Sequence, residues 1–211
     1  MKKQARLPYL KPSEMDECTR AFYEDVVREL DRPGLPHITK LEGGEMVGPF
    51  TAMFNDPVYG EPLYRLQLRV IKQAAIPRDI CELFILAVAC AEGAAYAIYA
   101  HELLAYDAGA PSAAIAAIKE GRAPGLDCPK AKAAYALALA LTRRGAVPQD
   151  VYDEALAQFG TGGLSVLVNT AALFKYLSTL MNAYDEPVPQ PGQLQQGPSE
   201  PESKTGIKAE G

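Results

Sequence analysis

The sequence predicts an all-α protein, and three observations support this prediction. Alanine is abundant and tryptophan is absent, and alanine enters a helix without losing side-chain entropy. Apolar residues recur at helical spacing in several long segments, whereas the two-residue alternation that is typical of half-buried strands is nowhere sustained. Proline and glycine separate these segments. We therefore expect a bundle of helices.

The first half of the chain predicts helices separated by one irregular segment. A capping-box-like start at Ser13 predicts a first helix that ends at Pro33-Gly34. Glycine in residues 35–48 predicts an irregular stretch, and its His37 is interpreted as a surface-loop histidine, although it could reach a pocket. Further helices are expected at residues 49–54, 57–75, 78–91 and 94–108, the third of them beginning after the break at Ile76-Pro77.

The second half continues with helices that begin at proline, serine or glycine. They are expected at residues 112–120, 129–144, 148–159 and 163–184. The whole of residues 1–186 is expected to form a single domain, because nothing separates two large apolar regions. Residues 187–211 are rich in proline, glycine, glutamine and serine, so we expect a disordered tail there.

Composition also bears on partners and location. The net charge is −5 and the basic residues are dispersed, which argues against nucleic-acid binding. Asn169 and Lys175 interrupt the longest apolar segment, which favours a core helix over a membrane span. No apolar segment follows the basic N-terminal residues as in a secretory signal. The four cysteines show neither a C-x-x-C motif nor zinc-ligand spacing. We expect a cytoplasmic protein with no metal and no cofactor.

Residues 77–109 carry the candidate site. Glu82 shares a helix face with Ile85 and other apolar residues, and a charge there is costly unless it is paired or used. His101 is one of two histidines and lies on the following helix. If Gly93 lets the two helices pack together, Glu82 and His101 would meet. A carboxylate bonded to an imidazole fixes its tautomer and supports proton transfer, but a buried pair that only satisfies itself is an equally good explanation.

This stretch resembles the carboxymuconolactone decarboxylase and alkylhydroperoxidase D family. The resemblance rests on Arg78-Asp79-Ile80-Cys81-Glu82, on residues 92–101, and on Ala105, Gly109 and Ile115. It spans about residues 45–185, and the spacing from Glu82 to His101 is its most specific part. It implies an alkylhydroperoxidase D-like helical bundle that assembles as a homo-oligomer, namely a dimer, trimer or hexamer. The apolar residues in 131–141 and 164–181, more than one helix face needs, also favour oligomerisation.

The family contains two chemistries, and the chain departs from both patterns. In the peroxidase branch a C-x-x-C precedes the histidine. Those two positions are Ala94 and Ala97 here, so the chain is interpreted as a cysteine-lacking member that cannot run disulfide exchange. In the decarboxylase branch the pattern is Tyr-Glu-Trp-x-x-His. The chain keeps Tyr96 and His101 but has Ala97 and Ile98 between them, which predicts a more apolar pocket and a substrate other than 4-carboxymuconolactone.

The resemblance and the residues together predict a cofactor-independent lyase. It would decarboxylate or isomerise a small lactone-like or β-keto-acid-like molecule, with His101 transferring the proton, Glu82 orienting it and Tyr96 bonding the developing oxyanion. Two alternatives stay open: a catalytically inactive oligomeric binding or accessory protein and, less favoured, a thiol peroxidase acting through Cys90. The expected substrate-binding residues are Phe50, Met53, Ala94, Ala97 and Tyr99.

Overall fold

The computed structural model describes residues 5–30 and 34–190, and it confirms the all-α prediction. These residues contain helices, loops and an isolated bridge between Lys40 and Met46, with no β-strand. Of the predicted tail, residues 187–190 carry no helix and residues 191–211 lie outside the described part of the chain. The helices are α1 (Glu17–Leu30), α2 (Pro49–Asn55), α3 (Pro57–Ile71), α4 (Arg78–Glu92), α5 (Ala95–Asp107), α6 (Ser112–Lys119), α7 (Pro129–Thr142) and α8 (Gln149–Ala183), preceded by a 3₁₀ turn at Pro12–Glu14.

Three helices differ clearly from their predicted bounds. Helix α3 ends at Ile71 rather than at residue 75. Helix α1 begins at Glu17 rather than near Ser13, because Asp16 caps it: its Oδ1 accepts the backbone N–H of Thr19 at 2.7 Å. The last two predicted helices are the two arms of α8, which is interrupted at Gly160. There the backbone turns away from helical values, with φ 65° and ψ 177°. Glycine adopts this conformation more readily than any other residue.

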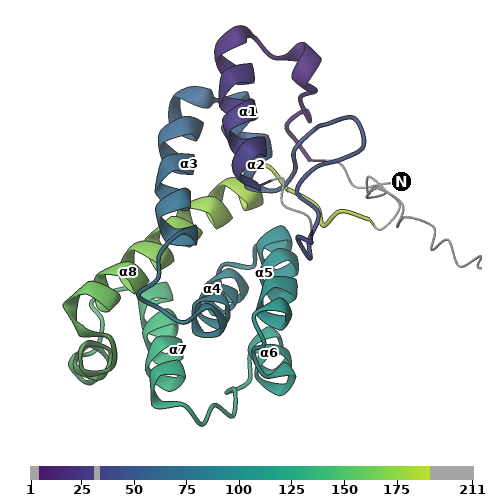
Figure 1. The fold of residues 1–211 in the computed structure, drawn as a ribbon. Coiled ribbons are helices and arrows are strands. Elements are labelled where there is room, and N and C mark those ends of the chain that lie inside the picture. The colour runs from purple at the N-terminus through teal and green to yellow at the C-terminus, as the bar shows by residue number, and fades with distance from the viewer. Residues whose placement is uncertain (1–4, 31–33, 191–211) are drawn as a thin grey trace, which may run out of the picture.

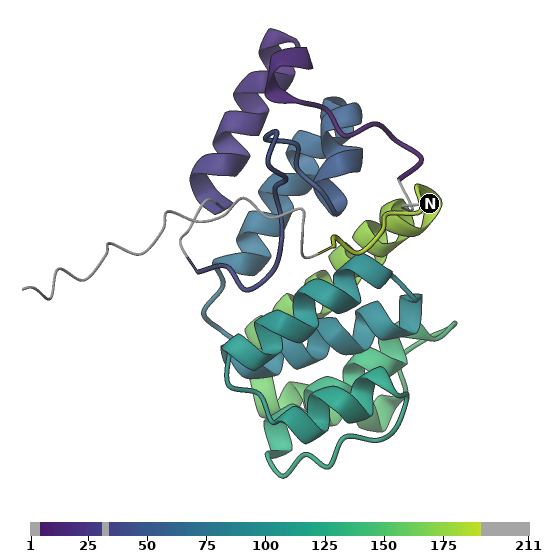
Figure 2. The same cartoon turned by 90° about the vertical axis from the view of Figure 1, so that its right-hand side faces the viewer.

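The helices form two groups joined by α8. Figures 1 and 2 show α1, α2 and α3 together at one end and α4 to α7 at the other, with α8 running alongside both. Helix α4 lies at the centre of the second group and contacts α5, α6, α7 and α8. Its residues from Leu83 to Ala89 are all buried, which explains its nearly continuous apolar sequence.

The buried face of helix α3 includes a glycine and a glutamine, while two of its apolar residues, Leu66 and Ile71, are exposed. Gly60, Tyr64, Gln67 and Val70 are buried, whereas Leu66 is 44% exposed. The cause lies at Gly60, where an added Cβ would come within 2.2 Å of the Met53 carbonyl oxygen. This close approach of α3 to α2 turns Gln67 into the interior.

The irregular segment between α1 and α2 is held by hydrogen bonds to distant residues. The Tyr96 hydroxyl donates to the Ile38 carbonyl at 2.6 Å, and the Ile38 N–H donates to the Tyr99 hydroxyl at 3.1 Å. Farther along, the Gly48 N–H donates to Glu186 Oε1 at 2.9 Å. The segment is therefore fixed against α5 on one side and against the residues after α8 on the other.

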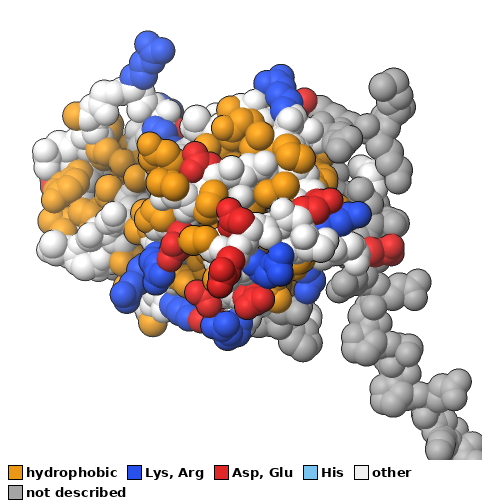
Figure 3. All heavy atoms as spheres, turned by 90° about the horizontal axis from the view of Figure 1, so that it is seen from above, with side chains coloured by type: hydrophobic (Ala, Val, Ile, Leu, Met, Phe, Trp, Pro, Cys, Tyr) orange, Lys and Arg blue, Asp and Glu red, His pale blue; other side chains and the backbone are white. Residues whose placement is uncertain are grey.

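The surface carries mixed charge, and many apolar residues of α7 and α8 are buried, although Val168 and Tyr176 of α8 are exposed. Figure 3 shows acidic and basic side chains intermingled on the face seen from above. Helices α7 and α8 pack on each other, so much of the apolar surface of residues 131–141 and 164–181 is buried within one chain. Helix α8 is long and apolar enough to cross a membrane, but half of its most apolar window is buried, so this is weak evidence for a membrane span.

Candidate functional site

Glu82 and His101 form a hydrogen-bonded pair between two adjacent helices. Helix α4 ends at Gly93, which adopts the left-handed conformation with φ 66°, and α5 begins at Ala95 and packs back against α4. This return places Nδ1 of His101 2.7 Å from Oε2 of Glu82, with side chains 13% and 14% exposed. A hydrogen on Nδ1 is donated to the carboxylate, which leaves Nε2 as the nitrogen available to a ligand.

The orientation of the His101 ring is fixed a second time by Phe174. The two rings meet edge to face, with centroids 4.7 Å apart and planes at 90°. Because Phe174 belongs to α8, the imidazole is held by side chains from two other helices, α4 and α8. An imidazole restrained in this way keeps its ring nitrogens in constant positions, which is what a proton-transfer group requires.

The pair lies in the wall of a cavity of about 570 Å³ between the two groups of helices. Its walls come from the ends of α1 and α3, from residues 34–39, and from α2, α4, α5 and α8. A volume of this size accommodates a small organic molecule. The lining is mainly apolar and includes Phe50, Leu68, Val70, Ile85, Ala97, Leu104, Phe174, Leu177 and Met181.

His37 also lines this cavity, so its interpretation as a surface-loop histidine was wrong. Its side chain is half-buried, and this burial, together with the nearby His101, lowers its pKa to about 4 although Glu82 opposes this effect. Its Nδ1 atom is buried and has no hydrogen-bond partner among the described residues. Local sequence did not reveal this position, because the bonds of Ile38 to Tyr96 and Tyr99 bring the loop over the cavity.

Gln67 is a cavity residue that the sequence did not reveal as functional. It is 8% exposed, lines the cavity, and its Oε1 atom has no hydrogen-bond partner among the described residues. The available signal was its spacing: Gln67 lies three residues after Tyr64 and three before Val70, on the face that α3 buries. A polar side chain in such a stripe is informative because buried polar groups normally have partners.

Tyr96 contacts the cavity but its hydroxyl hydrogen is used elsewhere. The side chain is 3% exposed, and the hydroxyl donates to the Ile38 carbonyl. Burial raises the pKa of Tyr96 well above its ordinary value, so the phenol remains protonated. In this geometry Tyr96 does not offer a hydrogen bond to an oxyanion, which differs from the expected role. It holds the loop that carries His37.

The expected substrate-binding residues separate into two sets. Phe50 and Ala97 line the cavity. Met53 and Ala94 are 1% and 0% exposed, lie in the core and do not line it. Tyr99 does not line it either, and its hydroxyl accepts a hydrogen bond from the Ile38 N–H.

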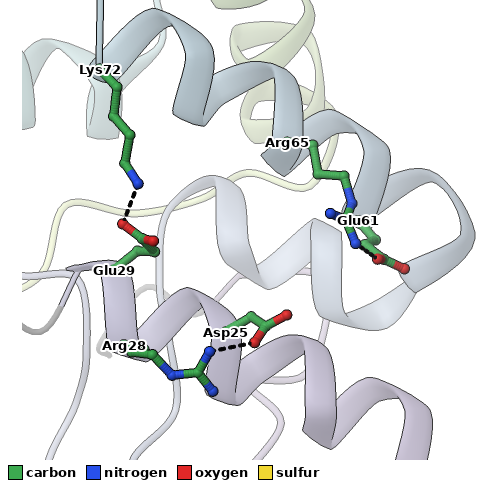
Figure 4. Close-up of polar contacts among 6 residues, drawn as sticks. All are labelled: Asp25, Arg28, Glu29, Glu61, Arg65 and Lys72. Atoms are coloured by element: carbon green, nitrogen blue, oxygen red, sulfur yellow. Dashed lines mark hydrogen bonds and ion pairs between the residues drawn. The ribbon is translucent and has the colours of Figure 1, made fainter.

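Charged residues at the edge of the cavity are paired with each other. Lys72, which follows α3, lies 2.7 Å from Glu29 of α1, and Figure 4 shows this pair spanning the gap between the two helices. On the other side, Arg78 of α4 lies 2.6 Å from Asp107 of α5. All four residues line the cavity. A ligand entering here meets paired charges around an apolar interior.

The description of the chain as cysteine-lacking was wrong, because it has four cysteines, all free. What it lacks is a cysteine at positions 94 and 97. Cys81 lines the cavity, and burial, assisted by Glu82, raises the pKa of its thiol to about 12. Burial also raises the pKa of Cys90, which does not line the cavity. Across residues 5–30 and 34–190, no three His, Cys, Asp or Glu side chains group so as to hold a metal ion.

Comparison with known structures defines the class of fold. The chain has an alkylhydroperoxidase D-like fold. A crystal structure of an alkylhydroperoxidase AhpD core, an uncharacterised peroxidase-related protein from Ralstonia eutropha, matches 90% of this chain and 94% of its own, with a TM-score of 0.70 and 12% sequence identity.

Two further crystal structures are similar. The first is a cysteine-to-alanine variant of the debrominase Bmp8 in complex with 2,3,4-tribromopyrrole, with a TM-score of 0.67, 14% identity and coverage of 89% of this chain and 92% of its own. The second is a protein of unknown function from Agrobacterium tumefaciens, described as a putative antioxidant defence protein AhpD. It has a TM-score of 0.60, 15% identity and coverage of 66% and 96%. No protein-family model and no curated protein sequence matches the chain.

Proposed function

We propose that this protein is a cofactor-independent enzyme that transfers a proton at carbon, and that it decarboxylates or isomerises a small lactone-like or β-keto-acid-like substrate. The observation that carries the proposal is the His101–Glu82 pair in the wall of a cavity large enough for a substrate. If Glu82 and His101 only satisfied each other's hydrogen bonds in the core, no cavity would be needed beside them. The similar structures, which include a debrominase, support an enzyme on this fold.

In the decarboxylation of a β-keto acid, the bond between the α-carbon and the carboxylate carbon breaks. Its electron pair moves into an enolate and carbon dioxide leaves. As an imidazolium, His101 then donates its Nε2 proton to the α-carbon, which keeps it, and the neutral imidazole takes up a new proton from solvent. Glu82 keeps Nδ1 hydrogen-bonded throughout and stabilises the imidazolium. An isomerisation uses the same enolate, with His101 removing one proton and returning it elsewhere.

The experiment is a screen of carboxylated lactones and β-keto acids for carbon dioxide release. We expect turnover by the wild type and a fall of about 100-fold or more in kcat for His101→Ala, since a positioned acid or base contributes 10²- to 10⁴-fold. Glu82→Gln should reduce kcat as well, because the amide no longer favours the required tautomer. Retained turnover in both variants would contradict the proposal.

Two alternative functions, an accessory protein and a thiol peroxidase, can be tested alongside this screen. An accessory protein without catalysis is less well supported, because the His101–Glu82 pair lies beside a cavity. A thiol peroxidase would have to use Cys81 or Cys90, whose pKa values are raised by burial, and neither has a resolving cysteine at positions 94 or 97. Peroxide consumption that disappeared in Cys90→Ser would support that alternative.

We further propose that the enzyme is a homo-oligomer, a dimer, trimer or hexamer. Val58 and Tyr59 at the start of α3 are 77% and 67% exposed, and large apolar side chains at that exposure are typical of contact surfaces when they occur together. Light scattering measures the assembly, and a monomer at all concentrations would contradict the proposal.

A further inference from the structure

The proposed reaction needs a group that the expected site residues do not supply. When carbon dioxide leaves, negative charge collects on the enolate oxygen, and hydrogen-bond donors aimed at that oxygen lower the barrier. Tyr96 was expected to provide this bond, but its hydrogen is donated to Ile38. His101 is occupied with proton transfer through Nε2. A donor to the oxyanion must therefore come from another residue of the cavity.

His37 lines the same cavity as His101 and has a ring nitrogen without a hydrogen-bond partner among the described residues. Its side chain lines the cavity that His101 and Glu82 also line. Its Nδ1 atom is buried without a hydrogen-bond partner among the described residues. Buried polar atoms normally have partners, and a side chain that lines a cavity and carries an unpartnered polar atom is a candidate for completion by a ligand or a water molecule.

The position of His37 is fixed by its neighbour in sequence. The peptide groups of Ile38 are bonded on both sides, at the carbonyl by Tyr96 and at the N–H by Tyr99. Both tyrosines lie on α5, the helix that carries His101, so the loop and the proton-transfer residue share one support. A donor placed by such contacts needs little reorganisation when charge develops.

The charge state of His37 suits a donor rather than a second base. Burial and the neighbouring His101 keep the His37 imidazole neutral near neutral pH. A neutral imidazole carries one N–H, which it can donate to a ligand oxygen. His101, by contrast, has its Nδ1 bonded to Glu82, so the two histidines have different roles.

We propose that His37 is a second catalytic residue, which donates a hydrogen bond from Nδ1 to the carbonyl oxygen of the substrate and then to the enolate oxygen. This inference rests on the proposed function and narrows the substrate class to enolisable carbonyl compounds. The carbonyl oxygen lies toward the loop at residues 34–39, and the carbon that receives the proton lies toward α5.

The test uses 4-nitrophenol as a stable mimic of the enolate, because it carries a phenolate oxygen and its absorbance reports ionisation. The wild type should bind the phenolate in preference to the neutral phenol. His37→Phe removes the donor and should weaken phenolate binding about 10- to 100-fold, the range for a hydrogen bond to a charged group. His37→Gln keeps an amide N–H and should recover a large part of this loss. Thermal unfolding of each variant shows that it is folded.

Turnover provides a second readout that separates the two proposals. His37→Phe should lower kcat about 100-fold with a smaller change in KM, as expected for a donor to the transition-state oxyanion. Turnover that depends on His101 but is unchanged in His37→Phe would overturn this inference alone. Equal phenolate affinity in wild type and His37→Phe would also overturn it, and would indicate that water completes Nδ1. No carbon dioxide release and no phenolate binding by the wild type would overturn the proposed function, and this inference with it.

Discussion

Tyr96 donates its hydroxyl hydrogen to the backbone carbonyl of Ile38, 2.6 Å away, and so joins helix α5 to the loop that carries His37. The same helix carries His101, whose Nδ1 lies 2.7 Å from Glu82. The two histidines of the chain therefore line one cavity from different segments. Tyr96 holds the loop of His37 against the helix that carries His101.

The first prediction concerns this link. Tyr96→Phe leaves the buried Ile38 carbonyl without its donor, and an unpaired buried acceptor costs about 1–3 kcal/mol. We expect the free energy of unfolding to fall by that amount and kcat to fall with it, because His37 is no longer held. Urea unfolding and carbon dioxide release measure the two effects. Unchanged stability would show that the bond does not hold the loop.

The second prediction concerns pH. The pKa of His37 is about 4 in the folded protein and about 6.5 in an unfolded chain. The unfolded state binds the proton more tightly, so lowering the pH favours unfolding. The free energy of unfolding is therefore unaffected by His37 above pH 6.5 and falls by about 3 kcal/mol as the pH approaches 4.

The variant His37→Gln isolates this dependence. His101 and Glu82, whose charges act on His37, are present in both proteins, so the difference between the two curves of stability against pH is assigned to His37. We expect the wild type to lose more stability than the variant between pH 6.5 and 4, measured by urea unfolding at each pH. Parallel curves would contradict the burial of His37.

The third prediction concerns Gly48, which precedes α2. Its φ is 72°, and an added Cβ would lie 2.2 Å from Cε1 of Tyr96. With ψ at −137° as well, Gly48→Ala therefore combines backbone strain of about 1–3 kcal/mol with a clash against the ring that holds the loop. Gly109→Ala is the matched control, because Gly109 has φ 80° and nothing within 4 Å of an added Cβ. Thermal unfolding should show the larger loss for Gly48→Ala, whereas equal losses would mean that the ring moves aside freely.

The fourth prediction concerns the cysteines. Cys18 and Cys128 are exposed, whereas Cys81 is buried in the cavity wall with a pKa of about 12. Thiolates are the reactive species, so iodoacetamide at pH 7.5 should modify Cys18 and Cys128 well before Cys81. Mass spectrometry of peptides over time measures the order. Modification of Cys81 at the rate of Cys128 would indicate a thiolate in the cavity and would favour thiol chemistry after all.

Helix-level features were predictable because they depend on local sequence. Alanine content, proline breaks and apolar spacing predicted α2 and α4 to α7 within a few residues, and the interruption at Gly160 was visible as a gap between two helices. The meeting of Glu82 and His101 followed from two helix faces joined at Gly93. The start of α1 was not predicted, because a 3₁₀ turn and the Asp16 cap compete with the capping-box pattern at Ser13.

The sequence by itself therefore determined an all-helical chain and placed one carboxylate and one imidazole where adjacent helices bring them together. Only the tertiary structure decided the rest of the site: that His37 and Gln67 line the cavity, that Tyr96 bonds to Ile38, and that Met53 and Ala94 lie in the core. The physical reason is the separation along the sequence of the residues that make the deciding contacts. Helix periodicity is fixed by residues three or four apart, whereas these positions depend on contacts such as Tyr96–Ile38 and Gly60–Met53 between different elements.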